Sequence, residues 1–262
     1  MVINDGQQFD YSKLEPFSRV MPISIIELNT SSGPSIARNL GIDHSRGKYL
    51  AFLDDDLFLQ NHLSQAIQTI EQKSLDFLYM GAIVLEKRLE TGMSISPYSI
   101  TKEYEYDERF LLIANNIHTG SVVTRNFRDS PVRFQSDLYQ CEDWDMWLRL
   151  VSELRYKTAY GKCKTTIYHQ IPENAGIVAN SQLSSPSPFT IARQYIYKKW
   201  PSHDTSVSVY RDWMTEFEEY RDSRITEGDQ MPNLLFDSVL GFLNECMVNK
   251  INPTSADIEI FF

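Results

Sequence analysis

Three consecutive aspartates end an apolar run in the stretch "AFLDDDLFL" (51–59). Neighbouring carboxylates repel one another and resist burial, so their position needs a physical reason. The preceding "KYLAFL" (48–53) is continuously apolar, which is typical of a strand buried on both faces of a parallel sheet. Ligands of open α/β sheets bind outside the carboxyl ends of such strands. The triplet therefore predicts an α/β fold with a ligand site at the end of this strand.

The carboxylates of the triplet are suited to a divalent cation. On an extended strand, Asp54 and Asp56 leave on the same side and Asp55 points away. Two hard oxygen ligands at a strand end fit Mn²⁺ or Mg²⁺ bridging a diphosphate, and the charge of the cation offsets theirs. The alternative is a solvated acidic turn, which would be the better interpretation of a lone Asp-x-Asp.

Two other metal–carboxylate families fit this stretch less well. A haloacid-dehalogenase-type phosphatase has Thr or Val where Phe58 stands. A prenyl-diphosphate synthase has Asp-Asp-x-x-Asp on a helix, whereas this triplet is followed by Leu57, Phe58 and Leu59.

The rest of the chain alternates apolar strand patterns with helical ones, which predicts an α/β fold with a mostly parallel sheet flanked by helices. Strands are expected at 1–5, 23–28, 48–53, 76–85 and 164–169, and helices ending near 45 and at 60–72, 142–154, 207–222 and 232–250, the last opened by Pro232. Residues 86–110 are expected to be irregular, and the Ser/Pro-rich 180–189 to be a flexible loop or linker. We expect one domain at 1–190 and a helical C-terminal extension at 191–262.

The composition limits the partners of the chain. Its 262 residues carry a formal charge of −10, which argues against nucleic acid or an anionic membrane surface as a partner. Three scattered cysteines make neither a disulfide framework nor a zinc site. No signal peptide and no transmembrane segment are recognised, so we expect a cytoplasmic protein, with homo-oligomerisation left open.

Four motifs, in order along the chain, resemble those of one enzyme family. They are "VINDGQ" (2–7), "ARNLGIDHSRGKYLAFLDDD" (37–56), "CEDWDMWLRL" (141–150) and "YHQ" (168–170). Together they closely resemble the family 2 glycosyltransferases, which have the GT-A fold, and the resemblance ends near residue 190. It implies transfer of a sugar from a nucleotide-diphosphate donor, a UDP-sugar first among them, to a hydroxyl of a saccharide or other acceptor. It also implies inversion at the anomeric carbon and a role in polysaccharide biosynthesis.

The resemblance assigns donor-side roles residue by residue. Asp54 is similar to the acid that contacts the ribose, Asp56 to the metal ligand, and Asp5 to the acid that contacts the nucleobase. Three further residues are placed at the donor or the metal: Asp55 and Arg38 at the donor, and His169 as a further metal ligand or diphosphate contact. Arg38 in a salt bridge across its helix, and His169 as a structural histidine, are the alternatives.

The resemblance also assigns the acceptor side. Asp143, at the start of the helix 142–154, is similar to the general base that deprotonates the acceptor hydroxyl. Simple helix capping is its alternative role, because carboxylates are favoured at a helix N-terminus, and Asp145 is a rival for the base. Trp144 and Trp147 are expected to anchor this helix in the core. The acceptor or sugar pocket is expected to include His118, Thr119 and Glu142.

One departure from the family concerns the start of the fold. In the family a first strand and helix precede the strand that "VIND" resembles, and this unit is not found in the sequence. We expect the neighbouring strands to pair directly, the C-terminal "DIEIFF" (257–262) to insert, or a slot to stay open, since unpaired buried backbone groups cost about 1–3 kcal/mol each. Donor binding should then be weak. The alternative function is a catalytically inactive GT-A domain that serves as a binding or scaffold module.

Overall fold

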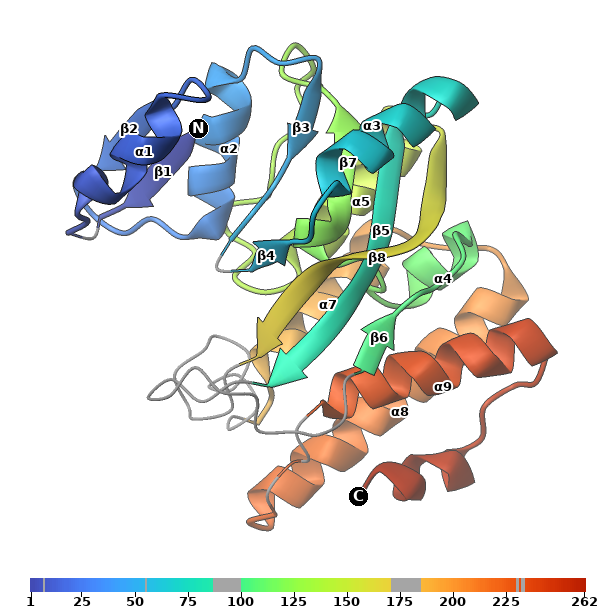
Figure 1. Ribbon diagram of the computed structural model, residues 1–262. Helices are drawn as coiled ribbons and strands as arrows, with labels where there is room; N and C mark the ends of the chain where they lie inside the picture. Colours follow the sequence, from blue (N-terminus) through green and yellow to red (C-terminus); the bar gives the residue numbers. More distant parts are fainter. Residues whose placement is uncertain (7, 55, 87–99, 171–184, 230, 232–233) are drawn as a thin grey trace.

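The computed structural model describes residues 1–6, 8–54, 56–86, 100–170, 185–229, 231 and 234–262 (Figure 1). The predictions for Asp55, for Pro232 and for residues 180–184 of the segment 180–189 lie outside these residues.

The described chain alternates strands and helices up to residue 170 and is helical from 188 onward. The strands are β1 (Val2–Asp5), β2 (Ile25–Leu28), β3 (Tyr49–Ala51), β4 (Leu57–Phe58), β5 (Phe77–Glu86), β6 (Ile100–Lys102), β7 (Val122–Arg125) and β8 (Thr158–Gln170). The α-helices are α1 (Glu15–Ser18), α2 (Pro34–His44), α3 (His62–Lys73), α4 (Glu108–Ile113), α5 (Glu142–Ser152), α7 (Pro188–Lys199), α8 (Thr205–Thr226) and α9 (Leu235–Asn249). Short 3₁₀ helices lie at η1 (Tyr11–Leu14), η2 (Thr119–Ser121) and η3 (Ser255–Phe261).

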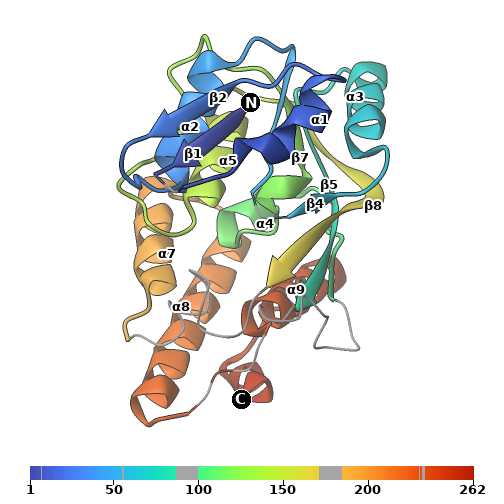
Figure 2. The ribbon, with the colours of Figure 1, turned by 60° about the vertical axis from the view of Figure 1, so that its left-hand side comes forward.

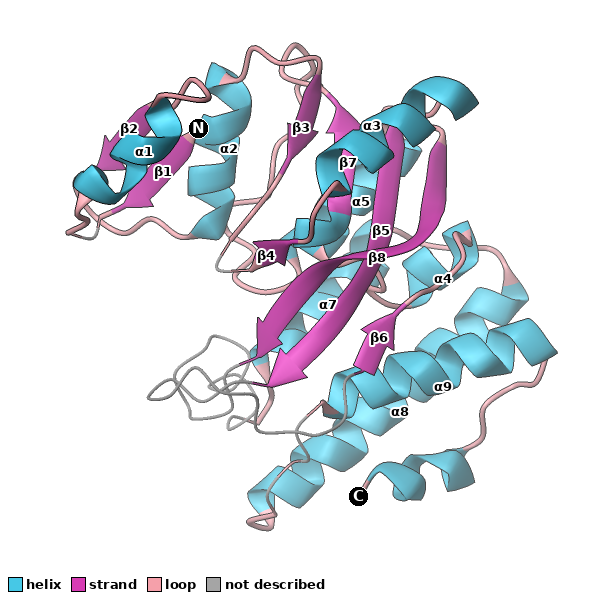
Figure 3. Ribbon diagram, viewed as in Figure 1, coloured by secondary structure: helices cyan, strands magenta, loops and turns pink. Residues whose placement is uncertain are grey.

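The larger sheet has the strand order β3-β7-β5-β8-β4, with β6 beside β5. Figure 3 shows these strands crossing the middle of the molecule between helices, so the predicted α/β class with a mixed sheet is confirmed. More of the strand pairings are antiparallel than expected among the described residues. Only β5–β8 and β1–β2 pair in parallel, while β3–β7, β5–β7, β5–β6 and β4–β8 are antiparallel. Antiparallel neighbours need no helical crossover, and the sequence pattern gave no direction to the short strands.

The strands β1 and β2 form a small sheet of their own. Among the described residues β1 pairs with β2 only, so the expected direct pairing across the missing strand is wrong. The expected insertion of "DIEIFF" is also wrong, because Ser255–Phe261 is the 3₁₀ helix η3, whose Ile258 is buried against α8 and α9. The two separate sheets correspond to the remaining expectation, in which no strand takes the place of the missing one between β1 and the larger sheet.

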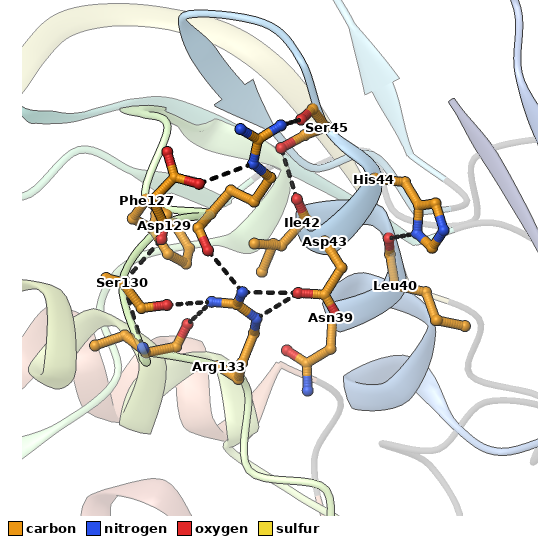
Figure 4. A network of polar contacts seen from close by, with 12 residues as sticks. Asn39, Leu40, Ile42, Asp43, His44, Ser45, Phe127, Asp129, Ser130 and Arg133 are labelled. Atoms are coloured by element: carbon orange, nitrogen blue, oxygen red, sulfur yellow. Dashed lines mark hydrogen bonds and ion pairs between the residues drawn. The ribbon is translucent and has the colours of Figure 1, made fainter.

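The helix α2 joins the small sheet to the rest of the fold. Arg133 contacts Asp43 near the C-terminal end of this helix at 2.7–2.8 Å and donates to the carbonyl oxygen of Arg128 (Figure 4). One turn earlier, Asn39 exchanges two hydrogen bonds with the backbone of Phe134, at 2.7 and 2.8 Å. These contacts fix the orientation of the helix that carries Arg38.

The described residues form three core clusters: one between α5 and the larger sheet, one between α3 and the same sheet, and one among the C-terminal helices. Trp144 and Trp147 are fully buried in the first cluster, as expected. The cluster among the C-terminal helices joins α4 to α8, α9 and η3, and in Figures 1 and 2 α8 and α9 lie on the side toward which β5 and β8 run. Helix α7 was not expected, and it spans the domain boundary predicted after residue 190. The division into two domains stays a prediction.

Candidate active site

A cavity of about 550 Å³ opens between the helices α2, α5 and α9 and the ends of the central strands. It gathers six of the charged or polar residues that were predicted as site residues. These are Asp5, Arg38, Asp54, Asp56, Glu142 and Asp143, and the predicted pocket residues His118 and Thr119 line it as well. The predicted donor and acceptor sides therefore meet in one cavity.

Asp54 and Asp56 both face this cavity but differ in their surroundings. The strand β3 ends at Ala51, earlier than expected, so the carboxylates leave from a bend and not from an extended strand. The side chain of Asp54 is 42% exposed, whereas that of Asp56 is 4% exposed. Asp56 accepts a hydrogen bond from the backbone N–H of His169 at 2.9 Å, and its other oxygen lies 3.1 Å from Nε2 of His118. Asp56 is thus a rigidly held acid and Asp54 an accessible one.

Arg38 connects the two sides of the cavity. Its guanidinium contacts Asp54 and Glu142, each at 2.7 Å, and lies over the ring of Phe134. The expected alternative, a salt bridge within the helix, is not what the structure has, because both partners come from other elements. Burial and the neighbouring charge of Asp143 raise the pKa of Glu142, and Arg38 opposes that rise. Arg38 thus balances two carboxylates that would otherwise repel each other.

Asp5 is already engaged by the protein. Its carboxylate accepts hydrogen bonds from the backbone N–H groups of Ser32 and Gly33 and from the hydroxyl of Ser31, at 2.7–2.9 Å. Burial raises the pKa of Asp5, but these hydrogen bonds outweigh it and lower the pKa below its ordinary value. Asp5 therefore shapes the loop before α2 at the edge of the cavity.

Asp143 and Asp145 begin the same helix but face different surroundings. Asp143 lines the cavity, and its two oxygens accept from Nδ2 of Asn115 and Oγ1 of Thr119, both at 3.0 Å. None of the ion pairs among the described residues involves Asp143. Asp145 is fully buried, accepts from Trp200 and is paired with cations away from the cavity. Of the two acids, Asp143 is therefore the one that faces the cavity.

Two histidines contact Asp56. His169, predicted as a metal ligand or diphosphate contact, donates its backbone N–H to Asp56. The side chain of His118, which was predicted in the acceptor pocket, lies against the other carboxylate oxygen of Asp56. Gly120 makes room for it, since a Cβ there would lie 2.9 Å from Nε2 of His118.

Two carboxylates in one cavity suit a Mn²⁺ or Mg²⁺ ion whose remaining ligands are phosphate and water oxygens. Within the described part of the chain, no group of three or more His, Cys, Asp or Glu side chains is arranged to hold a metal by itself. The carboxylates of Asp54 and Asp56 are therefore of the type that binds a divalent cation, provided that its remaining ligands come from outside this pair.

Sequence reasoning missed several lining residues. Asn115 lies three residues before His118, which was expected in the pocket, so its neighbourhood gave a signal for it. Lys102 gave none, because it lies in the segment 86–110 that was expected to be irregular. The apolar residues of α7, α8 and α9 gave none either, because they lie at or beyond the end of the resemblance near residue 190.

The fold and site define an α/β protein with an acidic ligand cavity at the strand ends. The chain belongs to glycosyl transferase family 2, whose sequence model matches residues 2–131, and it therefore has the GT-A fold. Among the described residues no helix is long and apolar enough to cross a membrane.

Three relatives illustrate the similarity. An uncharacterized glycosyltransferase of Bacillus subtilis, YwdF, is 29% identical over 153 residues, which are 56% of this chain and 54% of the relative. An uncharacterized glycosyltransferase of Rickettsia bellii is 42% identical over 78 residues, 29% of this chain and 11% of the relative. The Escherichia coli UDP-Glc:alpha-D-GlcNAc-diphosphoundecaprenol beta-1,3-glucosyltransferase WfgD is 23% identical over 132 residues, 50% of this chain and 49% of the relative. The matched part thus spans about half or less of the length of each relative.

Proposed function

We propose that this chain transfers a sugar from a nucleotide-diphosphate-sugar donor to a hydroxyl acceptor, with inversion. The observation that carries the proposal is the cavity itself. It holds Asp143, which accepts hydrogen bonds from three neutral donors (Asn115, Thr119 and the backbone N–H of Trp144), together with Asp54 and Asp56. The names of the relatives support sugar transfer, and the name of WfgD makes a UDP-sugar the first donor to test.

Asp143 is the proposed general base. Asn115 and Thr119 hold both of its oxygens without neutralising its charge, so a carboxylate stays available in the cavity. It takes the proton of the acceptor hydroxyl as that oxygen attacks the anomeric carbon, and the nucleoside diphosphate leaves on the opposite face. Such base catalysis contributes about 10²–10⁴-fold to a rate.

Asp54 and Asp56 would hold the divalent cation. When bound, the cation would stabilise the negative charge that develops on the leaving diphosphate. Asp56 is fixed by the backbone of His169 and by His118, and Asp54 by Arg38, so the chain presents both carboxylates in defined positions.

Replacing the base tests the proposal. Asp143→Asn keeps the two hydrogen-bonding neighbours but removes the proton acceptor, so turnover should fall about 10²–10⁴-fold with donor affinity nearly unchanged. The measurement is release of UDP from UDP-glucose with Mn²⁺ and a panel of saccharide acceptors. The matched control is Asp129→Asn, whose side chain is 89% exposed and which should keep full activity. Equal turnover of Asp143→Asn and the control would refute the assignment.

A binding or scaffold module is the second candidate. Two observations favour it. Asp5 already accepts three hydrogen bonds from the protein, and β1 and β2 form a sheet apart from the larger one. In that case the chain would bind no donor in the presence of Mn²⁺. Metal-dependent donor binding separates the two functions.

A further inference from the structure

The imidazole of His118 brings a nitrogen without a hydrogen-bond partner to the cavity. Its Nε2 atom is buried, and no group among the described residues forms a hydrogen bond with it. A carboxylate oxygen, Oδ2 of Asp56, lies 3.1 Å away, but the contact does not have the direction of a hydrogen bond. Both side chains line the cavity and are 10% and 4% exposed. A buried polar atom left without a partner costs free energy, so a ligand that binds this nitrogen is favoured.

Both atoms are held in place from behind. The backbone N–H and the hydroxyl of Ser121 donate to the carbonyl oxygen of His118, at 2.9 and 2.7 Å. The ring of His118 packs on that of Tyr168, with the ring centroids 4.6 Å apart. The other oxygen of Asp56 accepts from the backbone N–H of His169 at 2.9 Å. Nε2 of His118 and Oδ2 of Asp56 are therefore a preformed pair of ligand atoms, one nitrogen and one oxygen.

Gly120 keeps the space beside this pair open. A Cβ at that position would lie 2.9 Å from Nε2 of His118 and 3.7 Å from Oδ2 of Asp56. Gly120 is not among the described glycines with a positive φ, so its backbone would accept another residue. A side chain at this position would therefore disturb the space around the two ligand atoms and not the backbone.

The distance between the two atoms fits adjacent ligands of one octahedral cation. At metal–ligand bonds of about 2.1 Å, adjacent ligand atoms of an octahedron are about 3.0 Å apart. The observed separation of 3.1 Å agrees with this value. In the part of the chain that the structure describes, no three such side chains form a complete site. Oxygens of Asp54, of phosphate and of water would therefore supply the remaining ligands.

We propose that His118 is a ligand of the divalent cation, with its Nε2 atom bound beside Oδ2 of Asp56. The proposal rests on the proposed function and adds a nitrogen ligand to its cation site. The resemblance placed a histidine ligand at His169, but His169 contacts Asp56 through its backbone and is not among the described residues that line the cavity. Imidazole nitrogen binds transition metals better than it binds Mg²⁺, so the site should bind Mn²⁺ in preference to Mg²⁺.

Pulsed electron paramagnetic resonance of Mn²⁺ tests the ligand directly. The full chain is loaded with Mn²⁺ and UDP, and the spectrum reports whether a nitrogen nucleus is bound to the ion. A nitrogen coupling is expected, and isotopic labelling of histidine should change it. The coupling should be absent in His118→Gln and kept in His169→Gln and in His203→Gln, which is at an exposed position. No coupling in the unchanged chain, or a coupling that only His169→Gln removes, would overturn the proposal.

Titration with Mn²⁺ and with Mg²⁺ adds a second measurement. Replacing even a residue behind a metal ligand lowers metal affinity about 10–100-fold, so His118→Gln should weaken Mn²⁺ binding about tenfold or more and reduce the preference over Mg²⁺. Gly120→Ala keeps the imidazole but crowds the pair, so it should weaken Mn²⁺ binding as well. Thermal melting shows which variants are folded, and unchanged Mn²⁺ affinity in folded His118→Gln would contradict the proposal. If His118→Gln does not fold, the histidine label in the unchanged chain and in His169→Gln decides the outcome.

This proposal and the proposed function fail separately. If Mn²⁺ and UDP bind in a way that depends on Asp56 but without a nitrogen coupling, only the role of His118 is wrong. If the nitrogen coupling depends on His118 but no nucleotide sugar binds, the proposed sugar transfer is wrong and the metal site stands. If no Mn²⁺ binds to the chain, both are wrong.

Discussion

Asp143 and Asp145 lie on the same helical turn, but Asp143 lines the cavity whereas Asp145 forms buried ion pairs. Asp145 is fully buried and contacts Nε of Arg149 at 2.9 Å and Nζ of Lys199 at 2.8 Å. Trp200 also donates to it, so this single carboxylate joins α5 to the end of α7. Its charge is needed because two cations are turned toward it.

Asp145→Asn should therefore destabilise the fold more than it affects the chemistry. Removing one partner of a buried ion pair costs about 3–5 kcal/mol, and we expect the lower end because Arg149 and Lys199 still reach solvent. Urea unfolding measures the loss against Asp129→Asn, which should cost almost nothing. If Asp145→Asn is as stable as that control yet lacks turnover, the base has been assigned two residues too early.

His62 ties an element to the sheet, since it begins α3 and contacts Oγ1 of Thr165 on β8 at 2.7 Å. It is 1% exposed and stacks on Phe58. Burial disfavours its charged form and lowers its pKa to about 4, from an ordinary 6.5.

Stability should therefore depend on pH through His62. Between pH 6.5 and 4 the unfolded chain binds a proton that the folded chain does not, so the free energy of unfolding falls as the pH falls. The loss should be about 2 kcal/mol between pH 7 and 5. Comparing urea unfolding at both pH values, His62→Phe should remove that part of the difference, while His203→Gln, at an exposed position, should leave it. An unchanged difference in His62→Phe would contradict the buried neutral histidine.

Helices and strands could be predicted from the sequence where their apolar residues recur at a regular helical or strand spacing. The helix at 142–154 and the strand at 76–85 were found within two residues as α5 and β5, because each buries a regular apolar pattern. Helix α7 was missed because Ser187 caps it and Pro188 opens it, two residue types that also mark loops. "DIEIFF" alternates like a strand, but a capping box at Thr254 and Asp257 starts η3 instead.

At the scale of the whole molecule, the residues of the site could be predicted from the sequence better than the fold that surrounds them. The acids at 54 and 56 were expected on the donor side of a site and Asp143 on its acceptor side, and all three line one cavity. Their partners were less predictable, because contacts such as Arg38 with Glu142 join residues 104 positions apart. The split into two sheets depends on how distant segments pack, and no local pattern carries that information.

The central proposal is that the chain binds a nucleotide-sugar donor only when a divalent cation and the carboxylate of Asp56 are both present. The most direct measurement is isothermal titration of UDP-, GDP- and dTDP-sugars with and without Mn²⁺, on the chain as it is, on Asp56→Ala and on Asp143→Asn. We predict weak binding of one donor class that needs Mn²⁺, is lost in Asp56→Ala and is kept in Asp143→Asn. Binding of no donor, or binding that neither Mn²⁺ nor Asp56 affects, would contradict the account.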